Sequence, residues 1–209
     1  MQPGPTIIKI CSECSGLIAE DTIISGNTFG ATFWTDGKRD APMLPDQSWF
    51  VICPHCQTSI WIDEQEEAGE IEAFSKNEKY KDAKPYRTPI LNDYFNQLNI
   101  GNLDRNKEQY LRFRAWWAGN DERRKIGATK NELSDEEKVN IEGLYRMLDF
   151  SDDNDRIMMA EIKRELGEFD DAEAIIKETF ANEFTEAVTI IKELIEKKEL
   201  FVAEINFEK

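Results

Sequence analysis

Two matched cysteine pairs have the clearest chemical meaning in this sequence. The chain holds four cysteines, arranged as Cys11-Ser-Glu-Cys14 and Cys53-Pro-His-Cys56. Two residues between thiolates allow a tight turn to point both sulfurs at one ion, and two such turns complete a tetrahedral shell. A closed shell leaves no position for water or substrate. The pattern therefore predicts one structural Zn²⁺ whose ligands are Cys11, Cys14, Cys53 and Cys56.

His55 is the one histidine of the chain and lies inside the second cysteine pair. Because four thiolates already satisfy the ion, we expect His55 to be an ordinary residue of the turn rather than a ligand or a catalytic group. A redox role for either pair is less favoured, since a thioredoxin-type pair opens a helix in a βαβ unit and the sequence shows none. Phosphate-binding glycine loops and histidine-based zinc protease motifs are also absent. We expect a non-catalytic protein.

A basic stretch rich in aromatic residues is the second candidate for function. From Arg105 to Lys125 there are seven basic and three acidic side chains. Arginine beside exposed aromatic rings is typical of nucleic-acid binding. The simpler alternative is that the rings are core and the arginines pair with acidic helices later in the chain. Both interpretations stay open, and the candidate surface consists of Arg112, Arg114, Trp116, Arg123 and Arg124.

Charge and hydropathy narrow the class of protein. The 209 residues carry a formal charge of −16, and residues 131–209 alone hold 10 basic and 23 acidic side chains. Such a chain as a whole is repelled by nucleic acid and by anionic lipid. No stretch approaches the roughly 18 apolar residues of a membrane span, and the first ten residues do not resemble a secretory signal. We expect a cytoplasmic protein with no membrane partner, where paired thiols hold metal rather than form disulfides.

Residues 1–63 are predicted to form a zinc-ribbon-like domain. Short β-branched runs lead into and out of each cysteine turn, which is the strand–turn–strand layout of a ribbon. The 38 residues between Cys14 and Cys53 exceed the roughly 15–20 usual for such sites. We therefore expect an extra hairpin within the ribbon, Phe29–Met43, with its turn at Asp36-Gly37. Residues 64–85 are highly charged, which predicts a linker or a short helix around Gln65–Phe74.

Residues 86–209 are predicted to form an all-α domain, which makes the fold class α+β. Ser134-Asp-Glu-Glu137 is a capping box, and Asp104 is expected to cap a helix that runs to Ala118 and stops at Gly119. Apolar residues recur at helical spacing between these signals. The six expected helices start near Thr88, Asp104, Ser134, Arg156, Phe169 and Phe184.

One segment near the C-terminus resembles the helix–turn–helix of a tetratricopeptide repeat. In that family a small residue of the first helix meets an alanine of the second, and a glycine and an aromatic residue mark the turn. Arg156 replaces the usual early aromatic residue, Thr179 replaces a later small one, and the closing proline is absent. An ordinary antiparallel helix pair is the alternative. The matching residues, within 155–180, are Ala160, Gly167, Phe169, Ala172 and Ile176.

Five blocks of the sequence taken together resemble an uncharacterised family of bacterial proteins. In that family a zinc-ribbon-like N-terminus precedes a tetratricopeptide-like helical region. The resemblance implies a bacterial origin and a protein-interaction role, as an adaptor or scaffold, with no activity to carry over. The blocks are Cys11–Cys14, Ser25–Ala31, Trp34–Lys38, Cys53–Cys56 and Arg114–Ala118.

The sequence leaves three functions to distinguish. The favoured one is a zinc-stabilised module that binds an unknown protein partner. The second is nucleic-acid binding through the ribbon and the Arg112–Arg124 surface. In the third, the strongly acidic C-terminal third neutralises a basic partner, as an inhibitor or immunity-type protein would.

Overall fold

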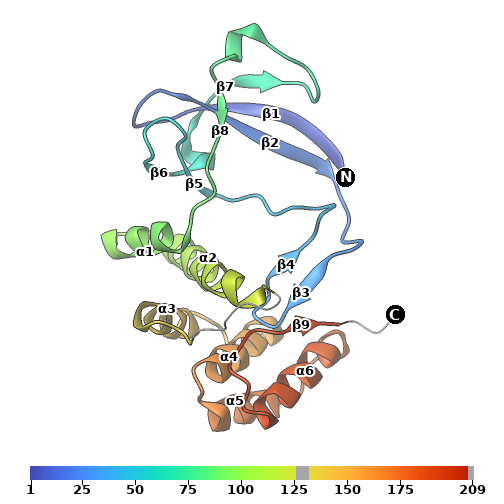
Figure 1. Ribbon diagram of the computed structural model, residues 1–209. Coiled ribbons are helices and arrows are strands. Elements are labelled where there is room, and N and C mark those ends of the chain that lie inside the picture. Colours follow the sequence, from blue (N-terminus) through green and yellow to red (C-terminus); the bar gives the residue numbers. More distant parts are fainter. Residues whose placement is uncertain (126–131, 207–209) are drawn as a thin grey trace. The chain divides into compact units, whose positions relative to one another are not determined.

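The computed structural model describes residues 1–125 and 132–206 of the chain (Figure 1). The described residues form a mixed α+β structure, with a sheet-rich N-terminal region followed by six α-helices, as the predicted fold class requires. The chain divides into two compact units. The sheet unit comprises Met1–Ala31 and Asp40–Asp93, and the helical unit comprises Thr32–Arg39 and Tyr94–Lys209.

The sheet unit is built on two antiparallel strand pairs, each joined by a cysteine turn. The first cysteine turn connects β1 to β2, and the second connects β5 to β6. The larger sheet has the strand order β7-β1-β2-β8, in which β8 runs parallel to β2. The strands are β1 (Gln2–Ile10), β2 (Leu17–Ser25), β5 (Phe50–Ile52), β6 (Ser59–Trp61), β7 (Glu66–Ile71) and β8 (Lys84–Pro85).

The segment 64–85, expected to be a charged linker or a short helix around Gln65–Phe74, instead contributes two strands to this sheet, and no α-helix forms there. Strand β7 pairs with β1 along the sheet edge, and short 3-10 turns precede and follow it at Ile62–Glu64 and Glu78–Tyr80. An edge strand exposes much of its surface, so it can carry the glutamates that made the segment read as a linker. Gly69 has φ 142°, and a Cβ there would lie 2.1 Å from the Tyr80 hydroxyl. That hydroxyl donates to the Ala68 carbonyl at 2.6 Å.

The helical unit holds α2 to α6, most of α1, and most of one small sheet. In the sheet, β3 (Thr32–Trp34) pairs antiparallel with β9 (Glu204–Ile205), and β4 (Arg39–Asp40) lies on the other side of β3. Figure 1 shows the helices in chain order from green to red. They are α1 (Leu91–Ile100), α2 (Arg105–Arg124), α3 (Asp135–Tyr145), α4 (Asp153–Glu165), α5 (Phe169–Ile176) and α6 (Thr185–Glu196).

Several predicted helix ends are confirmed and others are wrong. The capping box at Ser134 is present, with Glu137 as its reciprocal partner. The predicted stop at Gly119 is wrong, because α2 continues to Arg124. Glycine inside a helix costs only about 1 kcal/mol. A Cβ at this position would lie 2.4 Å from Glu137 Oε1, so the close approach of α3 accounts for a small residue here.

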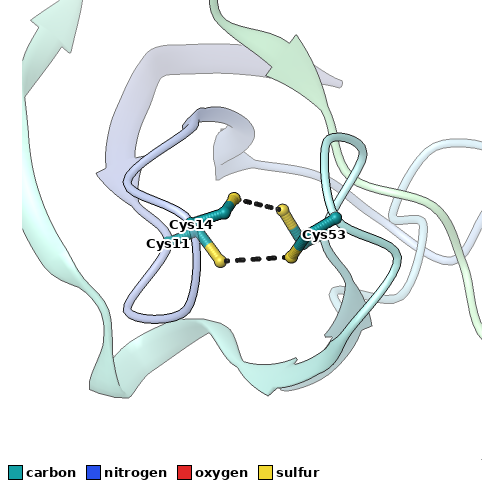
Figure 2. Close-up of side chains that lie close together, drawn as sticks. Cys11, Cys14 and Cys53 are labelled. Atoms are coloured by element: carbon teal, nitrogen blue, oxygen red, sulfur yellow. Dashed lines mark hydrogen bonds between the residues drawn. The ribbon is translucent and has the colours of Figure 1, made fainter.

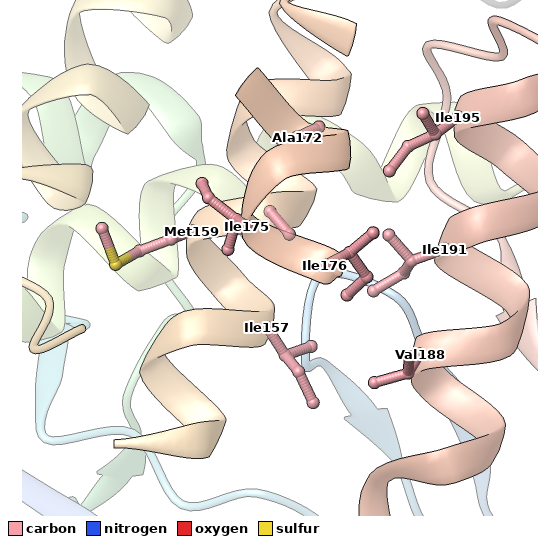
Figure 3. Close-up of a cluster of buried hydrophobic side chains, with 9 residues drawn as sticks. Ile157, Met159, Ala172, Ile175, Ile176, Val188, Ile191 and Ile195 are labelled. Atoms are coloured by element: carbon pink, nitrogen blue, oxygen red, sulfur yellow. The ribbon is translucent and has the colours of Figure 1, made fainter. Parts of the chain in front are cut away.

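Two apolar clusters hold the helices together. In the first, buried side chains from α4, α5 and α6 meet, as Figure 3 shows for Ile157, Ile176 and Ile191. The second joins α2, α3 and α4 through Trp116 and Leu144. Between α4 and α5, Gly167 has φ 80°, Gly167 N–H donates to the Arg164 carbonyl and Glu168 N–H to the Lys163 carbonyl. This glycine-terminated turn folds α5 back on α4.

The central part of the hairpin expected to extend the ribbon, Thr32–Arg39, belongs to the helical unit instead. Its turn forms as predicted, since Gly37 has φ 78° and its N–H donates to the Trp34 carbonyl at 2.9 Å. The N–H of Thr35 donates to the Ala203 carbonyl, and Thr35 and Asp36 are fully buried. The hairpin is far from the helices in sequence, so helical periodicity could not reveal this pairing.

Candidate metal centre

The four cysteine sulfurs converge on one point in the sheet unit. Their Sγ atoms all lie within 4.8 Å of one another. Dashed lines in Figure 2 join two of the sulfur pairs, which are Cys11–Cys56 at 3.9 Å and Cys14–Cys53 at 3.8 Å. A tetrahedral shell with metal–sulfur bonds of about 2.3 Å has sulfur–sulfur edges of about 3.8 Å. The four sulfurs are therefore close enough to one another to hold a metal ion. All four thiols are free, so none of them forms a disulfide.

The two cysteine turns have the same backbone geometry. In each, the N–H of the first cysteine donates five residues ahead, to Gly16 at 3.0 Å and to Thr58 at 2.9 Å. The residue after the second cysteine donates back to the first cysteine's carbonyl and has a left-handed backbone, with φ 59° at Ser15 and 63° at Gln57. Two segments 42 residues apart thus fold into equivalent turns. The geometry aims two sulfurs from each turn at the same point.

Two side chains outside the cysteines fix the turns in place. Gln65 Oε1 accepts from the Ser12 N–H at 2.8 Å, and Gln65 Nε2 donates to the Trp61 carbonyl at 2.9 Å. Gln65 is 9% exposed, so these bonds are shielded from water. His55 Nε2 lies 2.8 Å from the Leu17 carbonyl, which links the second turn to the strand that leaves the first.

His55 therefore plays a structural part, as a residue of the turn. Its ring lies against Gly16, where a Cβ would come within 2.5 Å of the imidazole. The cysteine cluster is the one group of candidate metal ligands among the described residues, and His55 is not part of it. The sequence pattern could not reveal the bond to Leu17 or the role of Gln65, which lies in the presumed linker.

The four cysteines differ in burial, and the pKa values of Cys53 and Cys56 are shifted in opposite directions. Cys11 and Cys53 are buried, whereas Cys14 and Cys56 are exposed. Burial raises the pKa of the Cys53 thiol to about 12. Hydrogen bonds from Thr58 lower the pKa of Cys56 to about 6. A bound cation favours the thiolate form of all its ligands, because it supplies the largest positive charge in the site.

The predicted basic surface does not form an open patch. Trp116 is 2% exposed, and its Nε1 donates to Glu165 at 3.0 Å. The Arg114 guanidinium lies over the rings of Tyr110 and Trp117. The other three arginines form ion pairs inside the helical unit: Arg112 with Glu108, Arg123 with Glu137, and Arg124 with Asp36 and Asp121.

The helical unit contains a buried polar cluster, which includes Asp36, the ion-pair partner of Arg124. The Asn120 amide donates to Asp36 at 3.1 Å and to Glu165 at 3.1 and 3.2 Å, so one amide bridges two carboxyl groups. Burial raises the pKa of Asp36, and it raises that of Glu165 to about 8. The sequence signalled Asp36 only as a turn residue, because the contacts join segments more than 80 residues apart.

Within the described residues, no helix is long and apolar enough to cross a membrane. Comparison of the chain with protein-family models, with curated proteins and with solved structures finds no match.

Proposed function

We propose that this chain is a non-catalytic protein-interaction module whose sheet unit is held by one structural zinc ion. The observation that carries the proposal is the convergence of four cysteine sulfurs from two equivalent turns. Four thiolates in tetrahedral arrangement are typical of structural zinc sites, and such a site has no open position for catalysis.

The small size of the sheet unit supports a structural role for the ion. The cysteines join the unit's own apolar cluster, since Cys11 and Cys53 pack with Ile18, Val51 and Ile60. Zinc binding contributes about 10–16 kcal/mol to folding in small zinc peptides. A comparable contribution would stabilise a unit with few regular elements. Four reduced thiols also suit a reducing compartment such as the cytoplasm.

The interaction role is supported by the helical unit. The α4–α5 hairpin brings Ala160 and Ala172 into one buried cluster, which agrees with the tetratricopeptide-like interpretation of this pair. Helical repeats of that class bind protein segments on their surfaces. Large apolar side chains are exposed on the unit, among them Ile100 at 75% and Val139 at 65%.

Elemental analysis of the purified chain tests the metal part of the proposal. We expect one zinc per chain, and we expect Cys53→Ser to lose it while Ser59→Ala keeps it. A stoichiometry near zero in wild-type protein purified without chelator would contradict the proposal. Affinity capture with the zinc-loaded chain tests the interaction part, which fails if no protein is retained specifically.

A further inference from the structure

A groove in the helical unit lies between α1 and α3. It has a volume of about 280 Å³, close to the lower limit of about 300 Å³ for ligand pockets. A space of this size suits one or two large side chains better than a drug-sized molecule. The lining residues are Phe95, Leu98 and Asn99 of α1, Arg112 of α2, and Asp135, Glu136, Val139 and Asn140 of α3.

The lining of the groove combines apolar and acidic side chains. Phe95, Leu98 and Val139 give it apolar walls, and Val139 is 65% exposed although it lies in the middle of a helix. Asp135 and Glu136 stand side by side at the start of α3, and neither forms an ion pair with another described side chain. An exposed apolar wall gains from being covered, and carboxylates with no ion-pair partner among the described residues favour a covering surface that carries cations.

The cation in the groove does not offset this acidity. Arg112 donates to Glu108 Oε1 at 2.7 and 2.9 Å, so its charge is already neutralised. Its guanidinium is held in place over Gly143, where a Cβ would lie 2.4 Å from Nη1. The walls therefore keep a negative charge, within a chain whose formal charge is −16.

We propose that this groove binds a basic amphipathic helix of a protein partner. An apolar anchor of that helix would lie against Leu98 and Val139, and its Lys or Arg side chains would face Asp135 and Glu136. Helix-in-groove binding uses this combination of apolar anchors and flanking charges. An acidic peptide or a nucleic acid is disfavoured by the same carboxylates. The inference rests on the proposed interaction function and names its site and partner class.

Two synthetic peptides test the proposal on the intact, zinc-loaded chain. Both are 14-residue amphipathic helices with leucine at the same positions, one with lysine and the other with glutamate at every polar position. Fluorescence anisotropy is expected to show saturable binding of the lysine peptide and none of the glutamate peptide. Absence of lysine-peptide binding at low salt overturns the proposal.

A matched pair of variants separates groove binding from general charge attraction. Val139→Lys and Thr189→Lys each replace an exposed β-branched helix residue by lysine, so the change in net charge is the same. We expect Val139→Lys to weaken lysine-peptide binding by at least about tenfold and Thr189→Lys by less than about twofold. Equal weakening by both variants overturns the groove as the site.

One further outcome would separate this inference from the proposed function. If affinity capture identifies a partner that Val139→Lys retains as well as the wild type does, the interaction function stands and the groove proposal fails. Glu136→Gln supplies a milder check, because it keeps the shape of the side chain. We expect it to weaken lysine-peptide binding by about two- to fivefold at low salt and less at high salt.

Discussion

Among individual residues, side chains beyond the four cysteines hold the two turns of the candidate metal site together. Gln65 and His55 connect the two turns through the Ser12 N–H and the Leu17 carbonyl. Residues in this position typically change metal affinity by about 10- to 100-fold when they are removed. The site is therefore better described as two clamped turns than as four independent ligands.

Replacing Gln65 by alanine tests this description. The change removes the hydrogen-bond partner of the Ser12 N–H and of the Trp61 carbonyl, and each lost bond costs about 0.5–1.5 kcal/mol. We expect Gln65→Ala to lower zinc affinity by at least about tenfold in a competition titration with a chromophoric chelator. Gln47→Ala is the control, because Gln47 is exposed and donates only to the Asp21 carbonyl. Equal affinities for the two variants would show that Gln65 has no role at the site.

The raised pKa of Glu165 should make the stability of the chain depend on pH. Its folded pKa of about 8 lies above the ordinary value of 4.5, because burial and the nearby Glu161 and Asp36 carboxyls disfavour its charge, while Arg164 favours it. A raised folded pKa gives a contribution that is complete below pH 4.5 and lost as pH rises through about 8. We expect the free energy of unfolding to fall over this range.

Urea unfolding at a series of pH values measures this effect. Glu165→Gln should flatten the pH dependence between about 4.5 and 8, whereas the exposed Glu142→Gln should leave it unchanged. Since Trp116 donates to Glu165, tryptophan emission should also titrate near pH 8 in the wild type and not in Glu165→Gln. An identical pH profile for wild type and Glu165→Gln would contradict the expectation.

At the level of secondary-structure elements, local signals were reliable and long-range pairing was not. The capping box at Ser134, the cap at Asp104 and the turn at Asp36-Gly37 depend on a few neighbouring residues, and the structure has all three. The strand β7 and the assignment of the hairpin to the helical unit depend on partners more than 50 residues away. Hydrophobic periodicity carries no information about such partners.

The candidate metal site shows the same division. The cysteine spacing identified the four residues that the structure brings together as candidate ligands, because two-residue spacing allows both thiols of a turn to point to one side. The spacing could not identify Gln65, because its bond to Ser12 joins distant segments. For the same reason, the sequence could not show that Asn120 in the helical unit bridges two carboxyl groups. The candidate arginine surface was misleading for a related reason. Sequence shows that a residue is charged but not whether a partner such as Glu137 or Asp36 lies beside it.

The hairpin makes a boundary at residue 86 unsuitable for isolating the helices. A fragment 86–209 lacks Thr35 and Asp36, so it loses the pairing with β9 and leaves the buried Arg124 without its main partner. Removing one partner of a buried pair costs about 3–5 kcal/mol. We expect the fragment to unfold at lower urea concentration than the helices of the full chain, as followed by circular dichroism at 222 nm.

A variant of the full chain provides the control for the fragment. Asp36→Asn keeps the hairpin and a hydrogen-bond acceptor but removes the charge, so its loss of stability should be smaller than that of the fragment. A fragment as stable as the full chain would show that the hairpin contributes nothing to the helical unit.

For the whole molecule, we expect loss of the metal to unfold the sheet unit without unfolding the helices. The ligands all lie in the sheet unit, and the helical unit has its own apolar clusters. Removing zinc with a chelator should therefore unfold the sheet unit and leave most of the helical signal at 222 nm intact. Simultaneous loss of the helical signal would show that the two units unfold together.

We propose above that four thiolates and no other group hold one zinc ion. X-ray absorption at the zinc edge of the purified chain measures the ligand atoms and their distances directly. The account predicts four sulfur neighbours at about 2.3 Å and none at shorter distance. Nitrogen or oxygen neighbours at about 2.0–2.1 Å would show an open or mixed site and would contradict the claim.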